Sequence, residues 1–287
     1  MASPVIKFDA LRAHRPIPID DLDEKTKYSQ EECHLRRKLA SCYRLIDLFG
    51  WSQGIDNHNT CRLPNSCNEF LINPYGLLFH ELTAGRLARM DLEGKTLDEG
   101  TSGLGVNYTG YVIHSAILKA RPDINCVIHM HSAPVMAVSC LKEAPYLPIT
   151  QEGCSFGEVS VHEFFGTAVD LDEQKHLVKN LGQNNVMVLR NHGVLACGHS
   201  IESAFLRAYY FMINATTQAL LTAVPENQLE VPNEQAKAAC QKASEEGIST
   251  SARLGEGVMD WEAWMRCLDR MGLKTGHQYR YKTLIDW

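Results

Sequence analysis

Two short apolar runs in the middle of the chain each lead into histidine, and this feature constrains the fold more than any other. The segment at 126–131 reads CVIHMH, and the segment at 186–193 reads VMVLRNHG. Short apolar runs bounded by polar or turn residues are typical of buried strands. Side chains two residues apart on a strand leave the same face, so His129 and His131 can converge on one ligand. We therefore expect the ends of two buried strands to bring His129, His131 and His192 together.

The three histidines predict a metal site. For His129 and His131 alone, two hydrogen-bonded histidines at the edge of the core are as good an interpretation as a metal clamp. His192 favours the metal, because three imidazoles with one open position form a common catalytic zinc site. Imidazole binds several transition metals, so we expect one zinc ion per subunit, with manganese and iron as alternatives.

The pattern around these runs indicates an α/β fold. Helical periodicity predicts helices between Ser29 and Gly50 and near 109–120, 133–141, 172–181, 200–222, 234–246 and 259–272. Extended segments are expected at 60–63, 70–72, 126–131, 146–151, 158–162, 186–190 and 193–197, with a hairpin around 93–95. Together they predict an α/β/α layered domain, in which helices flank a central, mostly antiparallel sheet.

Composition shifts suggest three segments. Residues 1–28 are rich in proline and charge, which predicts an extended arm on the surface. Residues 29–225 form the α/β domain, and prolines after residue 224 separate it from a helical extension at 226–287. The stripe of Trp261, Trp264, Met265 and Leu268 predicts that this extension packs on the domain or on a neighbouring subunit.

Composition also argues against several partners. The 287 residues carry a net charge of -6, and their 28 Lys and Arg are scattered, so we expect no nucleic-acid partner. No apolar stretch is long enough for a signal sequence or a membrane span. The ten cysteines are spread singly, as in a reducing compartment. We expect a cytoplasmic protein that makes no membrane contact.

Three segments resemble the class II aldolase/adducin head-domain family: RPD at 121–123, VIHMH at 127–131 and RNHGV at 190–194. The resemblance, which covers about 34–225, implies an antiparallel sheet between helical layers. It also implies zinc on His129, His131 and His192. Members commonly form tetramers whose active sites lie at subunit boundaries, so a homotetramer is expected.

Aldolases of this family carry a glutamate that ligates the metal and moves a proton, and its position falls on Gly110 here. Glu152 aligns loosely with the tyrosine that aldolases send across the subunit boundary. It is a candidate acid/base, or else an exposed loop glutamate. Tyr108 and Tyr75 are further candidate proton carriers. The phosphate-binding segments of the aldolases also differ here, as 57–58 and 74–76 show.

Among the other histidines, His58 could approach the site from the region of the phosphate loop, whereas His80 and His114 fit the surface or the core. Segments at 73–81, 106–110 and 265–272 look closer to adducin than to the bacterial aldolases.

The resemblance thus allows two functions. The first is a zinc-dependent class II aldolase, a carbon–carbon lyase of carbohydrate metabolism acting on a small carbonyl compound such as L-fuculose 1-phosphate. The second is a non-catalytic, oligomeric adducin-like module associated with actin and spectrin. Gly110 favours the second function, and the lack of a segment resembling adducin's Lys-rich tail favours the first. A different reaction on the same metal scaffold, such as decarboxylation, also fits the altered phosphate segments.

Overall fold

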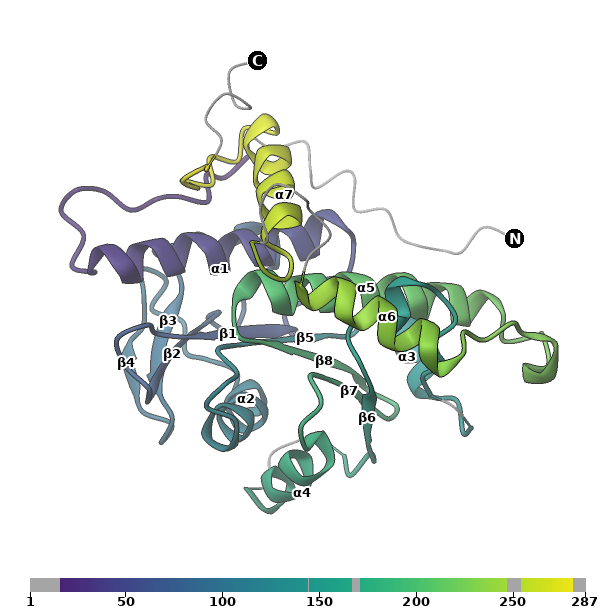
Figure 1. Cartoon of the computed structure of the whole chain (residues 1–287). Coiled ribbons are helices and arrows are strands. Elements are labelled where there is room, and N and C mark those ends of the chain that lie inside the picture. Colours follow the sequence, from purple (N-terminus) through teal and green to yellow (C-terminus); the bar gives the residue numbers. More distant parts are fainter. Residues whose placement is uncertain (1–15, 144, 167–170, 247–253, 281–287) are drawn as a thin grey trace.

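The computed structural model describes residues 16–143, 145–166, 171–246 and 254–280 (Figure 1). Its centre is an eight-stranded sheet with the order β4-β3-β2-β1-β5-β8-β7-β6. Neighbouring strands are antiparallel throughout, except for the parallel pair of β6 and β7. The strands are β1 (His58–Arg62), β2 (Glu69–Ile72), β3 (Ala88–Asp91), β4 (Thr96–Asp98), β5 (Cys126–Met130), β6 (Val159–His162), β7 (Val186–Leu189) and β8 (Gly193–Gly198).

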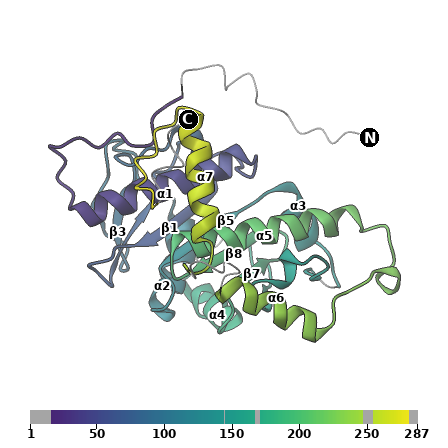
Figure 2. The same ribbon diagram turned by 45° about the horizontal axis from the view of Figure 1, so that its top comes forward.

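Helices cover both faces of the sheet, which confirms the layered α/β architecture (Figures 1 and 2). One layer contains α1 (Gln30–Leu48), α3 (Ala133–Ser139), α5 (Ile201–Leu220), α6 (Glu234–Glu246) and α7 (Val258–Arg270). The other contains α2 (Tyr108–Ala120) and α4 (Leu171–Leu181). Short 3₁₀ helices are η2 (Phe79–Glu81), η3 (Glu152–Cys154) and η4 (Glu226–Gln228).

Successive side chains of β5 point to opposite faces of the sheet and so belong to different clusters of the hydrophobic core. Ile128 belongs to the cluster beneath α1 and α5, whereas Val127 belongs to the cluster beneath α2 and α4. His129 follows Val127 by two residues and therefore faces the α2 side. His129 thus lies between the sheet and the smaller helical layer.

Helix α1 begins where the capping pattern predicts. The Ser29 hydroxyl accepts a hydrogen bond from the backbone N–H of Glu32, 3.2 Å away. Farther along the helix, the buried Tyr43 hydroxyl accepts from the backbone N–H of Asn59 at 3.1 Å. The Asn59 amide oxygen in turn accepts from the backbone N–H of His129 at 3.2 Å. This chain of contacts fixes β1 and β5 beside the site.

One predicted strand, at 146–151, is wrong. These residues form no strand, and the segment leads instead into η3. Pro148 offers no N–H to a ladder. The side chain of Asn214 on α5 takes the place of a neighbouring strand: its amide oxygen accepts from the N–H groups of Ile149 and Thr150, each at 3.1 Å.

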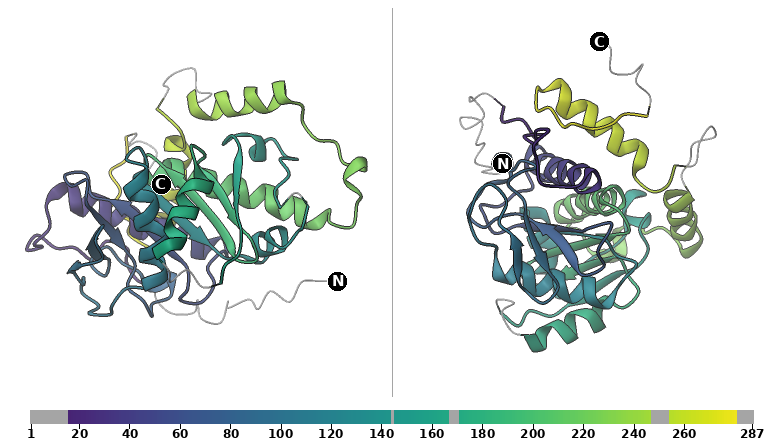
Figure 3. Two further views of the ribbon diagram at one scale, coloured as in Figure 1. Left: turned by 90° about the horizontal axis from the view of Figure 1, so that it is seen from below. Right: turned by 90° about the vertical axis from the view of Figure 1, so that its left-hand side faces the viewer.

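The described parts of both terminal segments pack against the central unit, and Figure 3 shows α7 lying across α1 and α5. Trp261 is buried against Phe205, with ring centroids 6.0 Å apart. In the N-terminal segment, Ile19 is buried and its backbone N–H bonds the carbonyl of Leu273 at 2.7 Å. The rest of the expected arm, 1–15, lies outside the described residues. The division of the chain into three segments, with boundaries after residues 28 and 225, stays a prediction.

Candidate metal centre

His129, His131 and His192 come together as predicted. Their candidate ligand nitrogens all lie within 4.8 Å of one another, and no carboxylate of the described residues belongs to the group. The Nε2 atom of His129 lies 2.6 Å from Nε2 of His131 and 3.3 Å from Nε2 of His192. Two tetrahedral zinc ligands with bonds of about 2.0–2.1 Å are separated by about 3.3 Å. The 3.3 Å distance matches this separation and the 2.6 Å distance is shorter, so the three nitrogens are close enough to share a single transition-metal ion.

Two of the rings are oriented by bonds on their far side. Nδ1 of His129 lies 3.0 Å from the carbonyl oxygen of Val194, and Nδ1 of His131 lies 3.1 Å from Oε1 of Gln53. Since both oxygens can only accept, each Nδ1 carries the proton and each Nε2 presents a lone pair. Outer contacts of this kind fix the tautomer and direction of metal-binding histidines.

The surroundings favour neutral imidazoles, the form that binds metals. Burial and the neighbouring histidines hold the pKa of His129 well below its usual value. Burial also lowers the pKa of His131 to about 4, and that of His192 is lowered for the same reason. Near neutral pH, these rings do not have to lose a proton before they bind a cation.

Two local features place His192. Asn191 has a positive φ of 55° in the turn between β7 and β8, a conformation that asparagine tolerates better than most residues. Gly193 follows, and a Cβ atom there would lie 2.4 Å from the carbonyl oxygen of Met130 and 2.9 Å from the ring of His131. The sequence Asn-His-Gly thus turns the chain sharply and leaves room for the other histidines.

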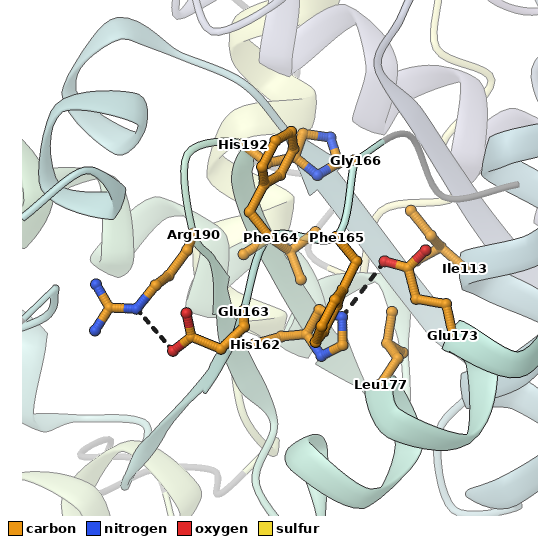
Figure 4. Close-up of a pocket in the computed structure, with 11 residues that line it drawn as sticks. Ile113, His162, Glu163, Phe164, Phe165, Gly166, Glu173, Leu177, Arg190 and His192 are labelled. Atoms are coloured by element: carbon orange, nitrogen blue, oxygen red, sulfur yellow. Dashed lines mark hydrogen bonds and ion pairs between the residues drawn. The ribbon is translucent and has the colours of Figure 1, made fainter. Parts of the chain in front are cut away.

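A small pocket of about 10 Å³, room for about one water molecule, adjoins the cluster and is lined in part by His192 (Figure 4). Phe164 and Phe165 contribute aromatic rings, while the ion pairs Arg190–Glu163 and His162–Glu173 measure 3.1 and 3.5 Å. The expectations from the sequence did not include this pocket. The available signal is two consecutive phenylalanines, Phe164 and Phe165, one residue after the end of β6.

The candidate proton carriers lie outside the cluster within one chain. Tyr108 is the first residue of α2 and is 54% exposed. Glu152 is in η3, which contacts α5 and α6 on the opposite side of the sheet from α2 (Figure 1). Tyr75 is also exposed. Any contact of Glu152 with the histidines would have to come from a neighbouring subunit.

His58, in contrast, lies beside the cluster. Its ring stacks on that of His129, with centroids 4.7 Å apart and planes 29° from parallel. Nδ1 of His58 lies 2.8 Å from Nε2 of His114, a buried residue of α2, as expected for a core histidine. Gly110, also on α2, faces the His58 ring.

Comparison with known proteins identifies the family of the chain. The profile of the Class II Aldolase and Adducin N-terminal domain matches residues 37–219. The chain belongs to the class II aldolase and adducin family. Alpha-adducin of Rattus norvegicus is 40% identical over 278 residues, which are 94% of this chain and 38% of alpha-adducin. The chain therefore spans about two fifths of the length of this curated relative.

Solved structures of the family share the fold. An aldolase II superfamily protein from Pseudomonas syringae superposes with a TM-score of 0.78 and 38% identity, covering 88% of this chain and 98% of that one. L-fuculose 1-phosphate aldolase from Glaciozyma antarctica gives a TM-score of 0.72 and 26% identity, covering 86% and 95%. This chain thus resembles both the adducins and the aldolases. Within its described residues, no helix has the length and apolar character that a membrane crossing requires.

Proposed function

We propose that this protein is a zinc-dependent carbon–carbon lyase of the class II aldolase type. Its substrate would be a small hydroxylated carbonyl compound, with L-fuculose 1-phosphate as the first to test. The observation that carries the proposal is the arrangement of His129, His131 and His192, whose Nε2 atoms lie together. Zinc at this position would supply a Lewis acid that polarises a carbonyl group.

The residues of the chain would supply orientation and proton transfer. Val194 and Gln53 hold two metal ligands in place. Because Gly110 has no acid group, proton transfer falls to Tyr108 in the same chain or to Glu152 of a neighbouring subunit in the proposed tetramer.

An aldol-cleavage assay tests this proposal. Purified zinc-loaded protein is offered a panel of ketose phosphates that includes L-fuculose 1-phosphate, with His129→Ala as the control for the metal. We expect cleavage of at least one compound by the wild type and none by the variant. Activity that survives His129→Ala would contradict the metal mechanism.

The two proton carriers can be separated in the same assay. We expect Tyr108→Phe or Glu152→Gln to lower kcat by about 100-fold or more, the range for loss of an acid/base group, without lowering the zinc content. A variant with unchanged kcat removes that residue from the mechanism.

A second candidate function is an adducin-like oligomeric module of the actin and spectrin cytoskeleton. The similarity to alpha-adducin favours it, because the two sequences are 40% identical over 94% of this chain. Co-sedimentation with F-actin, with and without spectrin, tests this function. Binding by a protein that cleaves no compound of the panel would support it over the lyase.

A further inference from the structure

The ring of His58 is held from several directions although it is not one of the three clustered histidines. His58 begins β1 and pairs in register with His129 on β5, so the two side chains are neighbours on one face of the sheet. The residue is 2% exposed. Its ring lies nearly parallel to that of His129, at a centroid distance of 4.7 Å. Any movement of the His58 ring toward the His129 ring would therefore displace the His129 side chain.

Hydrogen bonds restrict rotation of the His58 ring. Nδ1 of His58 is 2.8 Å from Nε2 of His114, and Nδ1 of His114 is 2.6 Å from the hydroxyl oxygen of Thr60. Thr60 lies two residues after His58 on β1, so the chain of contacts returns to the strand on which it began. His58 is thus fixed by its strand, by α2 and by the stacked ring.

Gly110 on α2 lies against the remaining side of the His58 ring. A Cβ atom at position 110 would lie 2.9 Å from both Cγ and Cδ2 of His58, closer than real Cβ contacts come. The φ angle of Gly110 is not in the left-handed region, so the backbone itself would accept alanine. Glycine inside a helix costs about 1 kcal/mol relative to alanine. The space taken by the His58 ring, rather than the backbone, accounts for glycine at this position.

We propose that His58 is a positioning residue of the metal site, and that Gly110 is required so that the His58 ring can support His129. His58 acts through the stack, which keeps Nε2 of His129 directed at His131 and His192. This inference rests on the metal-binding part of the proposed function and concerns binding of a divalent transition-metal ion, whatever reaction follows.

Four variants test the proposal: Gly110→Ala, His58→Ala, the double variant, and Gly105→Ala as the matched control. A Cβ atom at Gly105 would meet nothing within 4 Å, and its φ is not in the left-handed region. Zinc affinity is measured by competition with a chromophoric chelator. The visible spectrum of bound Co²⁺ reports ligand geometry, and urea unfolding of the metal-free proteins reports folding.

We expect Gly110→Ala and His58→Ala each to weaken zinc binding about 10-fold or more, as loss of an outer contact does, and to alter the Co²⁺ spectrum. Gly105→Ala should match the wild type. In the double variant, Gly110→Ala should cost nothing beyond His58→Ala, because the ring that the new methyl group would meet is gone.

Wild-type affinity in Gly110→Ala, or effects that simply add in the double variant, would overturn the proposal. If Gly110→Ala does not fold but the double variant does, the proposal is supported. If neither variant folds, the alanine destabilises helix α2 itself, and the proposal is contradicted. A wild-type protein that binds no zinc would overturn the metal site itself, which is a different result from failure of the variants.

Discussion

Gly193 lies so close to Met130 that a Cβ atom on the glycine would be 2.4 Å from the carbonyl oxygen of Met130. The two residues belong to neighbouring strands, β8 and β5, at the end of the sheet where the three clustered histidines lie. The opposing atom is backbone and cannot rotate away. Close approach of these strands is therefore a condition for the site.

Gly193→Ala should separate β5 and β8 at this end. We expect it to lower the free energy of unfolding by about 2 kcal/mol or more, as strain at a constrained backbone site does, and to abolish tight zinc binding. Urea denaturation and chelator competition measure the two effects. A variant with wild-type stability and affinity would show that the strands do not approach this closely.

Gln53→Ala should weaken the metal site without removing a ligand. The Gln53 side chain orients His131 through a contact of 3.1 Å, and loss of such an outer contact typically costs about 10- to 100-fold in metal affinity. Isothermal titration with zinc measures the change. Gln183→Ala, at an exposed position, is the matched control and should bind as the wild type does. Equal affinities in both variants would argue against a role for Gln53.

The buried histidines predict acid sensitivity of the metal-free protein. Burial lowers the pKa of His114 to about 3 and that of His131 to about 4, whereas an unfolded histidine titrates near about 6.5. Between these values the unfolded chain binds more protons, so stability should fall as the pH drops below about 6.5. The slope for one such histidine is at most about 1.4 kcal/mol per pH unit.

Urea denaturation between pH 7.5 and 4.5 measures this slope. His114→Gln should make it shallower, whereas the exposed His176→Gln should leave it unchanged. Equal slopes in the wild type and His114→Gln would contradict the buried, neutral state of His114.

The C-terminal segment should depend on one buried ion pair. Glu256 accepts two hydrogen bonds from Arg207 on α5, at 2.8 and 2.6 Å, and both residues are buried. Glu256→Ala leaves the arginine uncompensated, which typically costs about 3–5 kcal/mol in the free energy of unfolding. Urea denaturation checks this, with the exposed Glu230→Ala as the control. A loss below about 1 kcal/mol would show that the pair is not buried as described.

Much of the fold follows from local sequence signals. Ser29 and Glu32 locate the start of α1, and the apolar runs before His129 and His192 locate β5 and β7. Local signals failed at 146–151, where the Asn214 side chain from a distant helix replaces a strand neighbour. Such a contact depends on tertiary packing, which the spacing of apolar residues does not encode.

The site divides in the same way. Residue type and spacing were enough to group His129, His131 and His192. The support from Gln53 comes from a loop, and the stack of His58 on His129 depends on the register of β1 against β5. Neither register nor loop position can be read from one sequence, so these two contacts required the structure.

The zinc content of the purified protein is the decisive measurement for the three-histidine site. After purification without chelators, elemental analysis should find about one zinc ion per chain, as expected for a three-histidine site with an open position. His192→Ala, which removes one ligand while leaving β5 intact, should lose most of this metal. Both proteins are also incubated with excess zinc and then desalted. If the wild type then holds no more zinc than His192→Ala, the metal site is contradicted.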